Sequence, residues 1–168
     1  MNALALRISA LMALSMVGSG LVAPDEAPPF RPSVDRYGIV ELPADRANLQ
    51  GERFQLSSDR TAIVDWVDPR EHVVWEFLLP ESGPYAVLVE YAAPGGRGGC
   101  LFAVEIAGQV RQGHVHATGR DDRFLPQLMM TAVELESGVN RLVVRAVETP
   151  RGFVMNLRRV RLVPAAGG

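Results

Sequence analysis

Two histidines separated by one residue, His114 and His116, have the spacing in this sequence that most resembles a metal site. Residues i and i+2 of a β-strand point to the same face, so both imidazoles can reach one ion. A zinc site takes three or four protein ligands, and the remaining histidine, His72, would have to come from another strand. The pair is therefore a metal candidate with an incomplete ligand set, and the alternative interpretation is a polar strand edge.

Carboxylates also occur in pairs, which is the arrangement that general acid–base catalysis uses. The pairs are Asp65 with Asp68, Asp121 with Asp122 and Glu134 with Glu136. Such pairs indicate catalysis only where a cleft holds them at a defined separation. No Gly-x-Ser-x-Gly elbow is present, and the glycine-rich run at 95–99 lacks the Lys-Ser/Thr ending of a phosphate loop. We therefore expect a protein that is not an enzyme.

The single cysteine, Cys100, cannot form an internal disulfide. An activated thiol requires a base and electropositive surroundings, and only Arg97 stands nearby in the sequence. We expect Cys100 to be a small buried hydrophobic residue.

Composition places the chain among ordinary globular proteins and excludes two kinds of partner. The chain has 168 residues, of which 48% are hydrophobic and 21% charged, and this fits one domain. The formal net charge is −2. Because nucleic acids and anionic membrane surfaces favour a basic protein surface, neither is an expected partner.

The first residues predict export. Residues 1–23 carry one cation, Arg7, followed by an apolar stretch that is typical of a secretory signal peptide. This stretch is shorter than the roughly 20 apolar residues of a membrane-spanning helix, so no permanent membrane anchor is expected. We predict a secreted or periplasmic protein with a Pro-rich linker at 24–36, a β-domain at 37–164 and a tail at 165–168.

Period-two patterns of apolar residues predict that this domain is all β. Short runs rich in Val, Leu and Ile alternate with Gly, Pro or Asp clusters, and no segment holds a helical period. The expected strands are 38–42, 54–57, 61–67, 72–79, 84–92, 100–107, 109–116, 127–136, 140–147 and 153–163. In the strand at 72–79, Val73, Trp75 and Phe77 share a face that we expect to be core. In the last strand, a β-bulge would keep two out-of-phase apolar sets inward. These patterns favour an antiparallel β-sandwich.

Several segments together resemble a known family. They are IVELPADRANLQG at 39–51, IVDWVDPREHVVWEFLLPESGPYAVLVEYA at 63–92, the step from Thr118 to Phe124, AVELESGVNRLVV at 132–144 and FVMNLRRVRLVP at 153–164. Their order is similar to the galactose-binding-like jelly roll of carbohydrate-binding modules of families six and thirty-five, which are attached to secreted sulfatases and glycosidases. The resemblance implies a non-catalytic module.

The resemblance also implies where a sugar would bind. Members that bind sugar stack an aromatic side chain from the loop after the Thr and form a hydrogen bond through an Asn before the last strand. Here Arg120, Asp121 and Asp122 occupy the region of that aromatic, and Asn156 stands at the Asn position. Trp66, Tyr37 and Phe124 are the candidate exposed aromatics. The candidate carbohydrate-binding residues are thus Trp66, Arg120, Asp121, Asp122, Phe124 and Asn156.

The resemblance also raises the question of whether this chain binds the structural calcium ion of the family. The resemblance implies an acidic ligand in the first strand, which Glu41 matches, and an Asp after the Asn-Leu step, where this chain has Arg158. We therefore expect no cofactor, and calcium stays as the alternative.

The expected function is binding of a polysaccharide or other glycan by a secreted module. In a second version of this function, the ligand is an acidic glycan that arginine side chains bind. These are Arg120, Arg123, Arg145, Arg158, Arg159 and Arg161. The alternative function is a structural or protein-interaction accessory domain without a sugar site, with another envelope or secreted protein as its partner.

Overall fold

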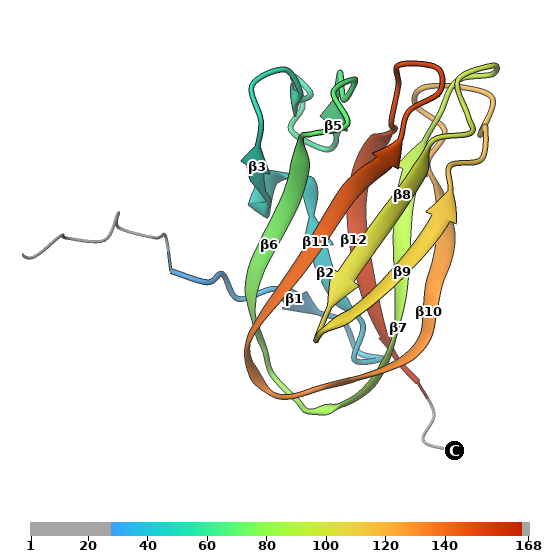
Figure 1. Ribbon diagram of the computed structural model, residues 1–168. Helices are drawn as coiled ribbons and strands as arrows, with labels where there is room; N and C mark the ends of the chain where they lie inside the picture. Colours follow the sequence, from blue (N-terminus) through green and yellow to red (C-terminus); the bar gives the residue numbers. More distant parts are fainter. Residues whose placement is uncertain (1–27, 166–168) are drawn as a thin grey trace, which may run out of the picture.

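Alternating apolar residues form two antiparallel sheets in the computed structural model, which describes residues 28–165 (Figure 1). The expected signal peptide at 1–23 and residues 166–168 of the tail lie outside the described residues. One sheet has the strand order β3-β6-β11-β8-β9. Its strands are β3 (Asn48–Gln50), β6 (His72–Leu79), β11 (Gly138–Glu148), β8 (Leu101–Ile106) and β9 (Gln109–His114).

The second sheet is built around the last strand, which pairs with β2, β5 and β7. β1 extends this sheet beyond β2, β4 extends it beyond β5, and β10 extends it beyond β7. Its strands are β1 (Ser33–Val34), β2 (Val40–Pro43), β4 (Gln55–Leu56), β5 (Ile63–Val64), β7 (Gly83–Ala92), β10 (Leu125–Leu135) and β12 (Asn156–Pro164). All strand pairs in both sheets are antiparallel, so the predicted antiparallel β-sandwich is confirmed.

The core lies between the sheets, on the faces that the period-two pattern predicted. Trp75, Phe77 and Phe102 are completely buried there, and aromatic side chains bury the largest apolar area per residue. The Trp75 indole still has a partner, because its Nε1 donates to the Pro43 carbonyl at 2.9 Å. The predicted bulge is also present. The pairing of β12 with β7 shifts register between Leu157 and Arg159, which turns both apolar sets of the strand inward.

The N-terminal boundary differs from the expectation. The segment expected to be a linker joins both sheets: the Phe30 N–H donates to the Glu76 carbonyl at 3.1 Å, and β1 pairs with β2. The folded part therefore begins by Phe30 rather than at residue 37.

Strands in the first half of the chain also differ from the predicted ones. β3 was not predicted, and the strand expected at 61–67 is reduced to the two residues of β5. The strand at 61–67 is shortened because Asp65 has a φ of 60°, which turns the chain out of the extended conformation.

The connections divide the molecule into two ends, and the division decides where a ligand can bind. The loops after β5, β7, β9 and β11 meet at the upper end in Figure 1, which we call the loop end. The hairpins β6–β7 and β10–β11 lie at the other end, which we call the hairpin end. Among residues 28–165, no helix is long and apolar enough to cross a membrane.

Candidate functional site

A pocket of about 420 Å³ opens at the loop end. This volume lies within the range of small-molecule sites. Four loops line the pocket with Val64, Asp65, Val67, Pro94, Arg97, Asp121, Phe153 and Asn156. The loop-end pocket therefore combines two carboxylates, one guanidinium and one amide with apolar walls.

The loop after β5 contributes Asp65 to the pocket. The left-handed backbone of Asp65 reverses the chain at this point. The Gln55 amide donates to the Asp65 carboxylate at 3.1 Å, and the Val154 N–H donates to the Trp66 carbonyl at 2.9 Å. These bonds fix the segment between neighbouring loops and hold Asp65 at the pocket wall.

The glycine-rich loop after β7 contributes Arg97. The Arg97 N–H donates to the Pro94 carbonyl at 3.1 Å, closing a turn in which Gly96 has a φ of 82°. The Arg151 guanidinium donates to the Gly96 carbonyl and ties this loop to the one before β12. The Arg97 guanidinium carbon then lies 5.4 Å from the centre of the Phe153 ring, a cation–π contact that orients it.

The loop after β9 contributes Asp121. Its base is anchored by Thr118, a buried residue whose hydroxyl accepts the Ala93 N–H at 3.0 Å. The Asn156 amide donates to the Asp121 backbone carbonyl at 3.0 Å. Because this contact uses the backbone, the carboxylate of Asp121 and the amide oxygen of Asn156 stay available to a ligand.

The structure thus brings two of the predicted sugar-site residues, Asp121 and Asn156, into one pocket. Arg120 and Asp122 instead pair with each other, with 74% and 59% of their side chains exposed, and they do not line the pocket. Phe124 is half-buried, and the Arg158 guanidinium lies 5.2 Å from the centre of its ring.

Trp66 was expected to be an exposed sugar platform, and that expectation is wrong. Its side chain is 0% exposed and packs on Phe54, with 5.4 Å between the ring centres. The turn at Asp65 breaks the period-two alternation and places Trp66 in the core.

Sequence reasoning missed two polar residues of the pocket, Asp65 and Arg97. Asp65 entered only as a member of an acidic pair, and nothing in its spacing indicates a left-handed turn. Arg97 carried a usable signal, because an arginine between two pairs of glycines is held at the tip of a loop.

Arginines elsewhere are engaged by carboxylates. On the outer face of the second sheet, Arg159 contacts Glu41 and Glu90 at 3.1 Å each, and Arg161 contacts Glu90 at 2.9 Å. Arg158 lies 3.6 Å from Glu90, which is itself buried. We call these five residues the β12 ion cluster. Hydrogen bonding to Glu90 is the main cause that raises the pKa of Arg159 above its usual value.

Glu41, the calcium candidate, belongs to this cluster. Its carboxylate accepts hydrogen bonds from the Arg159 guanidinium, so an internal cation already neutralises it. The other metal candidates, His114 and His116, lie exposed at the end of β9 and just beyond it. Within residues 28–165, no group of three or more His, Cys, Asp or Glu side chains is placed to hold a metal ion.

Cys100 is buried, as predicted. Burial raises the pKa of its thiol to about 11. The thiol is therefore protonated at neutral pH and is not an activated nucleophile.

Comparisons with known proteins agree with the fold. No family model matches the chain, and no curated protein matches it. Among solved structures, a family 35 carbohydrate-binding module from Clostridium thermocellum is similar over 76% of this chain and 98% of its own, with 15% identity and a TM-score of 0.61.

Two further structures show the same relation. The family 35 module of Cellvibrio japonicus Abf62 is similar over 76% of this chain and 94% of its own, with 17% identity and a TM-score of 0.59. The C-terminal family 6 module of the laminarinase LamC from Zobellia galactanivorans is similar over 74% and 98%, with 16% identity and a TM-score of 0.55. The chain therefore has the β-sandwich fold of these carbohydrate-binding modules, as its sequence pattern predicted.

Proposed function

We propose that this protein is a non-catalytic module that binds a carbohydrate in the loop-end pocket. The observation that carries the proposal is the convergence of four loops on one pocket with both polar and apolar walls. A sugar presents hydroxyl groups on its edge and C–H groups on its faces. The pocket offers matching surfaces for both.

The polar groups suit a ring with several hydroxyls. The carboxylates of Asp65 and Asp121 accept hydrogen bonds from hydroxyls, and charged acceptors form the stronger ones. The Arg97 guanidinium donates to ring or hydroxyl oxygens. Val67 and Pro94 supply the apolar wall against which C–H groups pack.

The charges favour a neutral sugar over an acidic one. The pocket holds two carboxylates and a single guanidinium, so a uronate or sulfate would be repelled. Five of the six arginines expected to grip an acidic glycan contact carboxylates of this chain instead. They are Arg120, Arg145, Arg158, Arg159 and Arg161.

We further infer that the module is non-catalytic and exported. The module acts without catalysis, because the residues of the pocket include no nucleophile paired with a base. It acts outside the cytoplasm, because residues 1–23 have the pattern of a secretory signal.

The test is a glycan array followed by calorimetry with the purified protein and two neighbouring variants. Asp121→Ala removes a pocket carboxylate but keeps the backbone carbonyl that Asn156 holds. We expect it to weaken binding of a neutral glycan about tenfold or more, because hydrogen bonds to charged groups are strong. Asp122→Ala, the matched control outside the pocket, should bind like the wild type.

A folded protein that binds no glycan on the array overturns the proposal and supports an accessory domain without a sugar site. Binding that Asp121→Ala and Asp122→Ala leave equally unchanged places the glycan elsewhere on the molecule.

A further inference from the structure

The hairpin end, opposite the loop-end pocket, carries a second surface with the features of a binding site. Its groove has a volume of about 610 Å³ and lies between the β1–β2 turn, the β6–β7 hairpin and the end of β12. β7 separates it from the loop-end pocket by roughly 30 Å, from the rise per residue of a ten-residue strand. Both sites can therefore be occupied at the same time.

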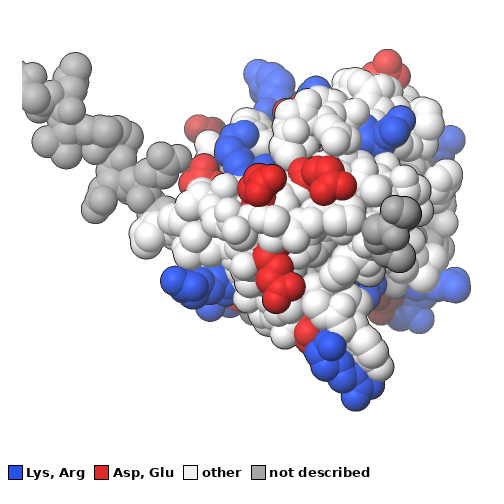
Figure 2. All heavy atoms as spheres, turned by 90° about the horizontal axis from the view of Figure 1, so that it is seen from below, with Lys and Arg blue, Asp and Glu red and all other residues white. Residues whose placement is uncertain are grey.

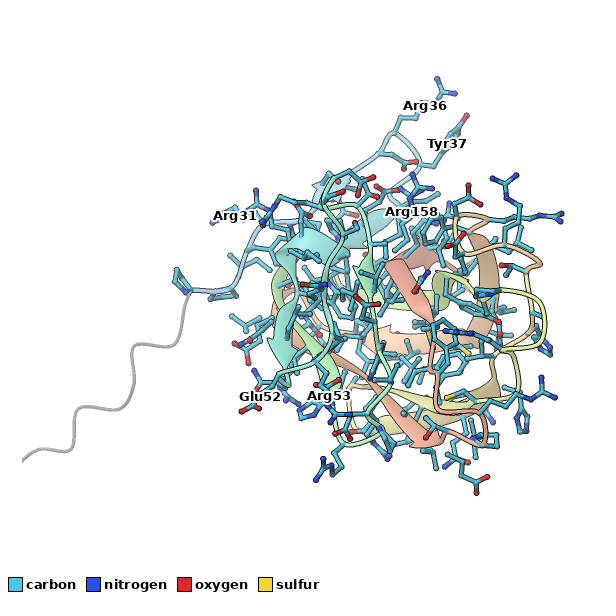
Figure 3. The ribbon with its side chains drawn as sticks, turned by 90° about the horizontal axis from the view of Figure 1, so that it is seen from above. Arg31, Arg36, Tyr37, Glu52, Arg53 and Arg158 are labelled. Carbon is cyan, nitrogen blue, oxygen red and sulfur yellow. The ribbon has the colours of Figure 1, made fainter. Side chains whose placement is uncertain are left out.

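The first feature is an exposed tyrosine on a rigid turn. Tyr37 is 67% exposed, and Figure 3 shows that it and Arg36 project away from the body of the molecule. The Asp35 carboxylate accepts the N–H groups of Tyr37 and Ile39 at 2.8 and 2.9 Å. The Gly38 N–H donates to the Asp35 carbonyl at 3.0 Å, and Gly38 has a φ of 78°, which favours glycine.

These bonds fix the backbone of the turn, so the position from which the Tyr37 side chain projects is already set before a partner binds. Tyrosine and arginine are the residue types that dominate the energy of protein interfaces. The Arg36 guanidinium lies 4.7 Å from the centre of the Tyr37 ring and is not among the residues that line the groove, so the anchor offered to a partner is the rest of the Tyr37 ring.

The second feature is a preformed groove beside this anchor. Its lining is part apolar and part polar, and the apolar part includes Val34, Pro80, Pro84 and Pro164. The Ala165 N–H donates to the Pro84 carbonyl at 2.9 Å and fixes the end of β12 against the β6–β7 hairpin. Proline walls and these bonds leave the groove little to reorganise on binding.

The third feature is charge. Asp35 and Glu81 line the groove, whereas no Arg, Lys or His is among its lining residues in the described part of the chain. Glu136 stands next to it, accepting a hydrogen bond from the Ser82 hydroxyl at 3.2 Å. Figure 2, which views the molecule from this end, shows several acidic side chains near the middle of the face. A complementary occupant is therefore cationic.

We propose that the hairpin end is a docking surface for a basic, extended peptide segment of a partner protein. Such a segment packs its backbone and apolar groups on the proline walls and on Tyr37, and it places Arg or Lys side chains on Glu81 and Glu136. The partner is recognised at this end independently of the carbohydrate at the other.

The test uses a fluorescent peptide of alternating arginine and proline as the probe, with an alternating glutamate–proline peptide as its control. Fluorescence anisotropy with the purified protein should show saturable binding of the basic peptide only. Tyr37→Ala and Glu81→Gln should each weaken it at least about tenfold, the effect of losing an interface anchor. Both changes leave the fold intact, because Tyr37 is exposed and Tyr85 is held by the backbone carbonyl of Glu81.

Two controls make the result specific. Glu148→Gln removes an exposed carboxylate at the other end of β11, and Asp121→Ala removes one of the two carboxylates of the loop-end pocket. Neither should change peptide binding. No saturable binding, or equal binding by Glu81→Gln and Glu148→Gln, overturns the proposal. An oligoglucosamine is tested in the same way. If it binds and Tyr37→Ala and Glu81→Gln weaken its binding as much as they weaken peptide binding, the ligand is a cationic sugar and not a peptide.

Discussion

The loop-end pocket and the β12 ion cluster contain the same types of charged residue but use them differently. In the cluster, three arginines surround Glu90 and Glu41, so their charges are satisfied within the protein. In the loop-end pocket, the Arg97 guanidinium contacts the Phe153 ring. Asp121 is held there by a hydrogen bond from Asn156 to its backbone carbonyl and not through its carboxylate.

The difference shows that burial and pairing, not composition, decide which charges are available to a ligand. Charges within the cluster connect β2, β12 and β7 across three adjacent strands of one sheet. The charged side chains of the pocket sit on loops, and no ion pair within the described residues joins Asp65, Arg97 or Asp121 to an opposite charge. Changes to the cluster should therefore alter stability, and changes to the pocket should alter binding.

The largest expected effect comes from breaking the cluster at its centre. Glu90→Gln removes the charge that three guanidinium groups share. It leaves the partly buried Arg158 and Arg161 without their carboxylate, whereas Arg159 keeps Glu41. We expect the free energy of unfolding to fall by about 3 kcal/mol, as for other buried pairs that lose one partner. Urea denaturation measures it.

Glu134→Gln is the control for this change, because Glu134 is exposed on β10. It should change the free energy of unfolding by less than about 0.5 kcal/mol. Equal stability of the two variants would mean that the cluster contributes nothing beyond an ordinary surface.

A smaller effect should appear at high pH, through the buried thiol of Cys100. Cys100 follows the glycine-rich loop, and its carbonyl accepts the Val115 N–H at 2.8 Å. Burial raises the pKa of its thiol from 9.0 to about 11. The unfolded chain therefore ionises first, so stability present below pH 9 is lost as the pH rises to about 11, on the order of 1 to 3 kcal/mol.

Urea denaturation across this pH range checks the loss, and Cys100→Ala should abolish that part of it. In the native protein at pH 8, a thiol reagent such as Ellman's reagent should react slowly. Fast reaction without denaturant would show that the loop end opens readily, in contrast to the cluster.

The sequence predicts the fold of this protein better than it predicts the candidate site. The strand at 72–79 matches β6, and the out-of-phase apolar residues of the last strand predicted its bulge, because burial on one face leaves a period of two in the sequence. β1 was missed, because Pro-rich segments indicate linkers even where the two residues after the last proline join a sheet edge.

The site was harder to predict, because loop geometry leaves no period. Asp121 and Asn156 lie 35 residues apart, and only the resemblance to the family placed them together. Trp66 was misplaced, because the left-handed turn at Asp65 reverses the face of the next side chain and no spacing rule indicates it. The sequence alone also did not predict which arginines pair with carboxylates, because the pairing depends on which strands lie side by side.

A change within the pocket should separate binding from stability. Arg97→Ala removes the only guanidinium that lines it. We expect affinity for the glycan identified on the array to fall about tenfold, with the free energy of unfolding within about 0.5 kcal/mol of the wild type. Arg111→Ala, an exposed arginine on β9, is the matched control and should change neither quantity. Loss of stability in Arg97→Ala would show that its contact with Phe153 is structural.

The smallest expected effect is that of calcium on the wild-type protein, which we expect to be zero. The Arg159 guanidinium lies between the carboxylates of Glu41 and Glu90, so a divalent cation would be repelled by it and would find both carboxylates engaged. Neither calcium nor a chelator should shift the melting temperature. The double variant Arg159→Ala/Arg161→Ala removes the two guanidinium groups that lie nearest to these carboxylates, and calcium should then raise the melting temperature of the variant alone. A shift in the wild type would show that an ion binds outside the β12 ion cluster, and no shift in either protein would show that Arg159 does not hold the two carboxylates close enough to share an ion.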